Sequence, residues 1–171
     1  MKKNRTNWQE FLFYSVFLIY FVILIAVLFR SSRETRMIKL VPFSTIRTFL
    51  SKDRIFHIFT ITNVLGNIIL FMPMGMYFMV FAQDKKSNKN VLWICLMSTG
   101  VELFQYAFKL GVGDIDDVIL NTLGGYLGIL MYRIILSKLK EEQKVKELIT
   151  NIAPIGVVMS FMVLFLLKGR F

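Results

Sequence analysis

The sequence contains a single cysteine, Cys95, and a single histidine, His57. One cysteine excludes an intramolecular disulfide. One cysteine and one histidine together are too few for the familiar zinc sites, which are built from several histidine or cysteine ligands. The HExxH, GxSxG and DDxxD patterns of metalloproteases, serine hydrolases and pyrophosphate-binding enzymes are also missing. We therefore expect no metal and no cofactor, and no familiar catalytic motif identifies the chain as an enzyme.

Acidic residues are scarce, because 11 Asp and Glu stand against 21 Lys and Arg, for a formal net charge of +10. Such a charge can indicate nucleic-acid binding, but these basic residues lie in short segments between apolar runs. In that position they suit anionic lipid head groups, so we expect no nucleic-acid partner. Five membrane spans would leave basic residues nearly even on the two sides, and charge alone does not choose the orientation.

Apolar residues are abundant, at 56% of the chain with 17 Phe. Five runs approach or exceed the roughly 20 residues that a helix needs to cross a bilayer. They are Phe11–Phe29, Ile55–Ala82, Val91–Phe108, Val118–Leu136 and Ile149–Leu167. Because lipid offers no hydrogen-bond partner to an open strand edge, they predict an all-α, polytopic helical bundle of about five transmembrane helices in the lipid bilayer. At 171 residues the chain is expected to form a single membrane domain, 1–171.

Between the first two runs, residues 30–54 form the longest polar connection. Five apolar residues there could line one side of a short amphipathic interfacial helix that starts near Ser44. They are Leu40, Val41, Phe43, Ile46 and Leu50. An ordinary amphipathic connector explains the same pattern, and both interpretations stay open. Farther along, the helix-forming composition of residues 137–148 predicts that the fourth helix extends into solvent.

Glu102 is the residue in the predicted spans that most disfavours insertion into the bilayer. An acidic side chain near the middle of a span raises the free energy of insertion by on the order of 3 kcal/mol. Gln105 and Tyr106 follow it by three and four residues and therefore share its helix face. The cost falls if the carboxyl group is neutral, paired or in contact with water. Bonding to Asn63, Asn67 or Asn121 would be a purely structural solution, and a functional role is the alternative.

Other polar and small residues in the spans also have structural explanations. Asn63 and Asn67 share one face of the second helix, where asparagines commonly form hydrogen bonds between transmembrane helices. Gly124 and Gly128 form a GxxxG pair that is typical of close helix packing. Pro73 should kink or loosen the second helix and belongs to the same packing set.

The segment GDIDD, from Gly113 to Asp117, precedes the fourth run. Asp114 can cap that helix, and Asp117 resembles the second residue of a capping box, which leaves Asp116 unexplained. Faces from three helices could meet in a polar cavity at one membrane surface. The ligand-binding candidates are Asn63, Asn67, Glu102, Gln105, Asp114, Asp116, Asp117 and Asn121. Carboxylates and amides of this kind suit a hard cation or a positively charged group.

Four motifs in this order resemble the VanZ-like family of bacterial membrane proteins. They are LVPF at residues 40–43, NVLGNIILFMPMGMYF at 63–78, VELFQYAF at 101–108 and GDIDDVILNTLGGYLG at 113–128, within a core of about 37–132. The resemblance implies a small multi-pass helical bundle in the bacterial cytoplasmic membrane. Its name-giving members are associated with resistance to teicoplanin-type glycopeptide antibiotics. Many members carry an arginine just before the aspartates, where this chain has Gly111–Gly113.

Three functions are compatible with these observations. The first is a non-enzymatic cell-envelope protein whose acidic pocket binds a lipid-linked or cationic amphiphilic ligand and contributes to glycopeptide tolerance. The second is a membrane enzyme that acts on a lipid-linked envelope substrate and uses Glu102 and Asp117 as acid and base or as holders of a divalent ion. The third, a transporter, would be expected to show more spans and inverted repeats.

Overall fold

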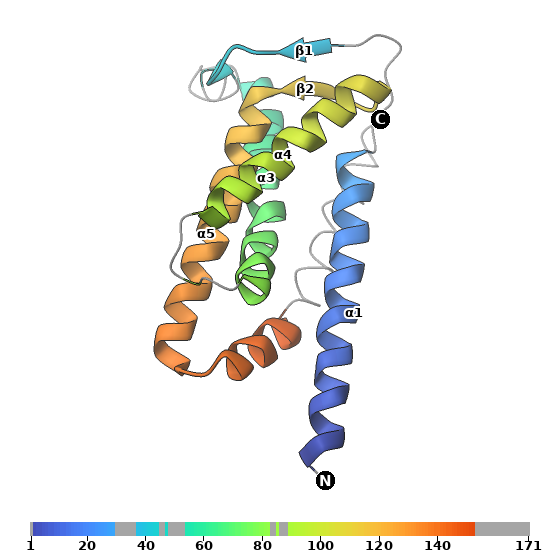
Figure 1. Ribbon diagram of the computed structural model, residues 1–171. Coiled ribbons are helices and arrows are strands. Elements are labelled where there is room, and N and C mark those ends of the chain that lie inside the picture. Colours follow the sequence, from blue (N-terminus) through green and yellow to red (C-terminus); the bar gives the residue numbers. More distant parts are fainter. Residues whose placement is uncertain are drawn as a thin grey trace. The chain divides into compact units, whose positions relative to one another are not determined.

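The computed structural model describes residues 2–29, 37–44, 47, 54–82, 85 and 89–152, with the backbone alone for 2–6, 54–60 and 62. The elements in chain order are α1 (Lys2–Leu28), β1 (Met37–Lys39), α3 (Arg54–Phe81), α4 (Lys89–Phe108), β2 (Val112–Asp114) and α5 (Ile115–Leu139) (Figure 1). Residues 142–152 are also helical. The predicted all-α fold is confirmed, and two three-residue strands are the departure from it in the described part.

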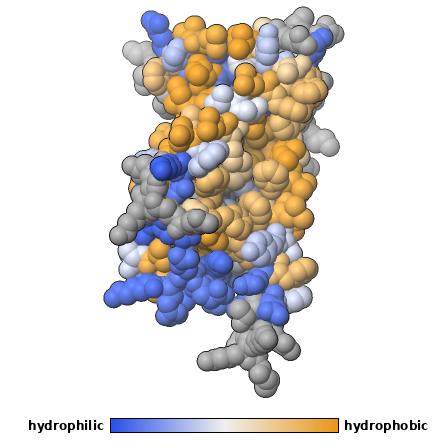
Figure 2. Space-filling model, viewed as in Figure 1, coloured by the Kyte–Doolittle hydropathy of each residue, from blue (hydrophilic) through white to orange (hydrophobic). Residues whose placement is uncertain are grey.

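Four described helices contain segments that are long and apolar enough to cross a membrane. These are Asn7–Leu28, Asn63–Phe81, Lys89–Phe108 and Ile115–Leu139, which match the first four predicted spans. The fifth predicted span falls mainly on residues 153–171, and the interfacial helix mainly on 45–53, so most of both lies outside the described residues. Less than half of each described span is buried, and apolar side chains dominate the face shown in Figure 2, as contact with lipid tails requires.

The fourth predicted helix corresponds to α5. It does not continue through residue 148, so the predicted extension is wrong. α5 ends at Leu139, and Lys140 has a φ of 58°, in the left-handed region where helices commonly stop. A separate helix then covers residues 142–152. The composition of residues 137–148 favours helix throughout and contains no glycine, so the sequence shows no sign of this stop.

The chain divides into two compact units. One consists of Met1–Leu28 together with Tyr132–Phe171. In it Phe13 and Tyr20 of α1 are buried, as is Val145 of the helix that follows α5. The other unit is Phe29–Met131, and it contains every candidate site residue.

Glycines bring the backbones of α3 and α5 close together in the Phe29–Met131 unit. A Cβ added to Gly124 would lie 2.3 Å from the carbonyl oxygen of Ile68, and one added to Gly128 would lie 1.9 Å from that of Met72. No side chain fits at such distances, so these two positions require glycine while the helices stay this close. Pro73 lies inside α3, which continues to Phe81, and its part in the packing stays a prediction.

A short parallel strand pair lies at one end of α3, α4 and α5 (Figure 1). Met37 of β1 is opposite Val112 of β2, and Lys39 is opposite Asp114. β2 connects α4 to α5 and packs on α4, since a Cβ added to Gly113 would lie 3.4 Å from the Glu102 carbonyl oxygen. This short connection places Asp114 at the start of α5.

Candidate functional site

The candidate site is built around the first turn of α5. Asp114 caps this helix, because its Oδ1 accepts a hydrogen bond of 2.9 Å from the backbone N–H of Asp116. The cap position predicted from the sequence is therefore the one observed. The predicted capping-box role of Asp117 is not what the described hydrogen bonds show, since the carboxylate of Asp117 accepts from another helix.

Asp117 joins α5 to α3. Its Oδ1 accepts from the side-chain amide of Asn67 at 2.7 Å and from that of Asn63 at 3.2 Å. The predicted shared face of the two asparagines thus points at Asp117. Asn63 is exposed and Asn67 is half-buried, so this contact runs from the surface into the bundle.

Glu102 joins α4 to β2. Its side chain is 6% exposed, and Oε2 accepts a hydrogen bond of 2.9 Å from the backbone N–H of Asp114. The sequence suggests Asn63, Asn67 or Asn121 as its partner, but the described amide hydrogen bonds of all three go elsewhere. Glu102 lies six residues before the end of α4 at Phe108 and not at the middle of the span, so it meets the strand that follows the helix.

Asp116, which sequence reasoning left unexplained, holds the segment after β1. Its Oδ1 accepts from the backbone N–H of Phe43, and its Oδ2 accepts from the Ser44 hydroxyl at 3.1 Å. The Asp116 side chain is almost fully buried. Sequence reasoning missed Ser44 as a site residue, and the available signal was LVPF, which ends at Phe43 directly before it.

Asn121 and Gln105 are not shown to bind the carboxylates. The Asn121 side-chain amide donates to the Ser98 hydroxyl at 3.0 Å, and both side chains are fully buried between α5 and α4. Gln105 is buried against Gly111, where an added Cβ would lie 3.3 Å from its Cδ. Ser98 was also missed, and its spacing of four residues before Glu102 was the available signal.

The site brings four acidic side chains together. Asp114 and Asp117 lie close enough to Glu102 to interact with it electrostatically, and Lys39 is close enough to interact with Asp117. The Lys39 ammonium nitrogen lies 3.7 Å from Asp114 Oδ2, at a largely exposed position next to β2. We call Glu102, Asp114, Asp116 and Asp117 the carboxylate cluster. In the described ranges no three His, Cys, Asp or Glu side chains are arranged to hold a metal ion.

The cavity predicted at this membrane surface stays a prediction. A described pocket lies in the other unit, between α1 and the helix 142–152. Its lining includes Glu10, Lys146 and Glu147 and none of the candidate residues. The carboxylate cluster is therefore described by its hydrogen bonds and its acidic side chains, and the described pocket does not include it.

Comparison with known proteins gives the family. In a search of curated proteins, Protein VanZ of Enterococcus faecium is 33% identical over 70 residues, which is 41% of this chain and 44% of that protein. The chain therefore matches less than half the length of this relative. No solved structure matches. The VanZ/LLP1 family model matches residues 11–136, which includes α1 from Phe11 onward as well as the predicted core, and the chain therefore belongs to the VanZ/LLP1 family.

Proposed function

We propose that this protein is a multi-pass, non-enzymatic protein of the bacterial plasma membrane that contributes to tolerance of teicoplanin-type glycopeptides. In this proposal the carboxylate cluster binds a positively charged group of an envelope amphiphile. Membership of the VanZ/LLP1 family and four apolar helices of membrane-spanning length support this assignment.

The observation that carries the proposal is the position and charge of the carboxylate cluster. Four carboxylates from β2, α4 and α5 gather where the spans of α3 and α5 begin and that of α4 ends. Lys39 is the basic side chain that the described ion pairs place against them. Charge of one sign in such a place attracts and concentrates ligands of the opposite sign.

The surroundings of the cluster support an amphiphilic ligand. The adjoining helices expose large apolar side chains such as Leu65 and Ile69 of α3 and Leu103 of α4. A ligand with a cationic head and an apolar tail would satisfy both surfaces, with its head at the cluster and its tail against the helices.

The test is glycopeptide tolerance in cells that depend on this protein for it. Asp117→Asn removes the acidic group and keeps a side chain of the same size. We therefore expect tolerance to fall while the amount of protein in the membrane is unchanged. Glu141→Gln is the matched control, because Glu141 lies outside the candidate site, is exposed and forms an ion pair with the exposed Lys144 at 2.9 Å. Full tolerance in cells carrying both Asp117→Asn and Glu102→Gln would contradict the proposal.

An enzyme acting on a lipid-linked envelope substrate is the second candidate. The feature that favours it is the proximity of Glu102 and Asp117, which is close enough for an electrostatic interaction, as paired catalytic carboxylates require. Purified protein incubated with envelope lipids would then change the mass of one lipid class, and Asp117→Asn would abolish that change. Binding without any change in mass supports the first candidate.

A further inference from the structure

The loop Leu40–Phe43, which directly follows β1, exposes its apolar side chains. Leu40 is 66% exposed, Val41 70% and Phe43 57%. Three large apolar side chains in four consecutive residues form a patch that water does not favour. Met37 and Ile38 of β1 extend the same exposed apolar surface.

The backbone around the 40–43 loop is held firmly. On one side β1 pairs with β2, and on the other the carboxylate of Asp116 binds the Phe43 N–H and the Ser44 hydroxyl. Phe43 itself has a φ of 62°, a conformation that costs a non-glycine residue roughly 1–2 kcal/mol. An apolar loop that is fixed outward, with strain at its aromatic residue, is typical of an interaction surface.

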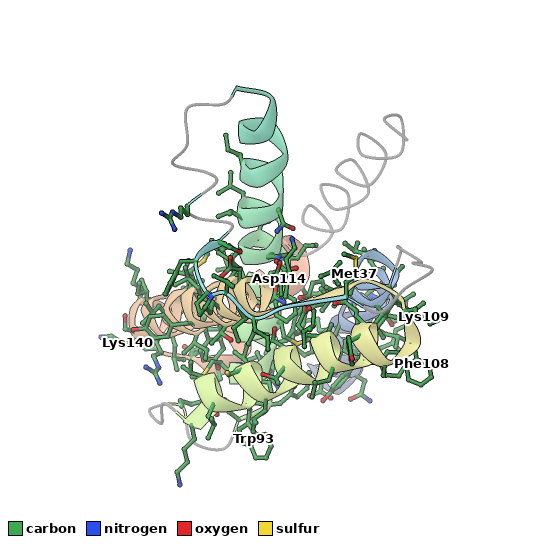
Figure 3. All side chains as sticks on the ribbon, turned by 90° about the horizontal axis from the view of Figure 1, so that it is seen from above. Met37, Trp93, Phe108, Lys109, Asp114 and Lys140 are labelled. Carbon is green, nitrogen blue, oxygen red and sulfur yellow. The ribbon has the colours of Figure 1, made fainter. Side chains whose placement is uncertain are left out.

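The position of the loop favours lipid as what covers it. The strand pair lies at the end of the bundle where the span of α4 stops at Phe108, a residue that is itself 62% exposed. Figure 3 looks onto this end and shows Met37 and Asp114 along the strands and Phe108 and Lys109 at the end of α4. Helices of membrane-spanning length place their ends near the boundary between lipid tails and head groups.

Two exposed basic residues near the strand pair and its loop suit the head groups of acidic phospholipids, whereas Asp114 and Asp116, the acidic residues beside the loop, are buried. Arg47 is exposed one turn after Phe43, whose carbonyl oxygen accepts from the Arg47 N–H at 2.8 Å. Lys109 is exposed at the end of α4, three residues before Val112, the strand partner of Met37. Apolar side chains with flanking basic residues are the combination that binds anionic membrane surfaces.

We propose that the 40–43 loop inserts its apolar side chains into the head-group region of the bilayer, while Arg47 and Lys109 bind anionic phospholipid head groups. The loop thereby fixes the depth of the strand pair in the membrane. This surface is exposed, whereas the carboxylate cluster, which anchors the loop through Asp116, is mostly buried.

The experiment uses tryptophan fluorescence of the full chain in lipid nanodiscs. Trp8 and Trp93 are replaced by Phe, and one tryptophan is introduced by Phe43→Trp, or by Val41→Trp if the first variant does not fold. Lys144→Trp, at an exposed position of the helix 142–152, is the matched control. We expect brominated lipids to quench the tryptophan at position 43 and acrylamide to leave it bright, with the reverse result at position 144.

The head-group preference is measured in the same samples. Brominated phosphatidylglycerol, diluted in unbrominated phosphatidylcholine, should quench the probe at position 43 more than the same fraction of brominated phosphatidylcholine. Combining Arg47→Gln with Lys109→Gln should reduce this preference about fivefold or more. An equal effect of the two brominated lipids would overturn the anionic preference. Quenching at position 43 by acrylamide alone would overturn lipid insertion. Quenching by neither reagent would also overturn it and would indicate that a protein partner covers the loop.

Discussion

The buried carboxylate of Glu102 accepts a hydrogen bond of 2.9 Å from the backbone N–H of Asp114, the residue that caps α5. One acidic side chain in α4 thus holds the strand that leads into the next helix. Asp114 and Asp117 also lie close enough to Glu102 to interact with it electrostatically, so this hydrogen bond stands within a group of acidic side chains. A structural and a charge-dependent role for Glu102 can therefore be separated by substitution.

Glu102→Leu should lower stability, because it leaves the buried Asp114 N–H without its acceptor. Losing the partner of a buried donor costs about 1–3 kcal/mol. Glu102→Gln keeps an oxygen acceptor for this N–H and cannot carry a buried charge, so its stability should equal or exceed that of the native chain. Thermal unfolding of the purified proteins in one detergent measures both. Equal melting of the Leu variant and the native chain would show that the hydrogen bond does not hold the strand.

The two asparagines that bind Asp117 should contribute unequally. Asn67 donates at 2.7 Å from a half-buried position, whereas Asn63 donates at 3.2 Å from an exposed one. Water can replace the exposed donor but reaches the inner one less easily. Asn67→Ala should therefore lower the melting temperature clearly, and Asn63→Ala only slightly. A larger loss for Asn63→Ala would contradict this order.

The sequence predicts the parts of this site that depend on local spacing. The four-residue spacing of Asn63 and Asn67 and the cap at Asp114 follow from helix geometry, and both are observed. The partners of Glu102 and Asp116 could not be predicted, because each carboxylate accepts from a backbone N–H, a group that nearly every residue has.

The strand pair was missed for a related reason. β1 and β2 are three residues each and pair across more than 70 positions of the sequence, from Lys39 to Asp114. Strands this short leave no alternating pattern, and a parallel pair has no hairpin turn to mark it. The contacts that place the 40–43 loop against α5 are likewise visible only in three dimensions.

Glycines in the spans fall into two groups that should respond oppositely to alanine. A Cβ at Gly128 would lie 1.9 Å from the Met72 carbonyl oxygen, whereas one at Gly66 or Gly100 would meet nothing within 4 Å. Overpacking of this kind typically costs 1–3 kcal/mol, so Gly128→Ala should destabilise the protein. Gly66→Ala and Gly100→Ala should be neutral or stabilising, by up to about 1 kcal/mol, because alanine favours helix. Destabilisation by all three substitutions would remove the case for specific packing at Gly128.

Asp116 should control the order of the segment after β1. Asp116→Ala removes the acceptor of both the Phe43 N–H and the Ser44 hydroxyl, while Ser44→Ala removes one donor and keeps the other contact. We expect amide hydrogen exchange in a peptide covering residues 40–44 to speed up by about tenfold in Asp116→Ala, equivalent to about 1.4 kcal/mol. Ser44→Ala should show a smaller change. Native exchange rates in Asp116→Ala would mean that strand pairing alone fixes the loop.

The buried contact between Asn121 and Ser98 should be worth less than its burial suggests. The Asn121 amide donates to the Ser98 hydroxyl at 3.0 Å, but Asn121 Oδ1 is buried and accepts no hydrogen bond within the described residues. Hydrogen bonds between transmembrane helices average about 0.6 kcal/mol in double-mutant cycles and reach about 1.7. Each single substitution, Asn121→Leu or Ser98→Ala, leaves a polar partner without its contact, whereas the double variant removes both groups together. The double variant should therefore be more stable than the sum of the single losses predicts, by 0.6 to 1.7 kcal/mol in unfolding titrations. Strict additivity would show that the two side chains are neighbours without being coupled.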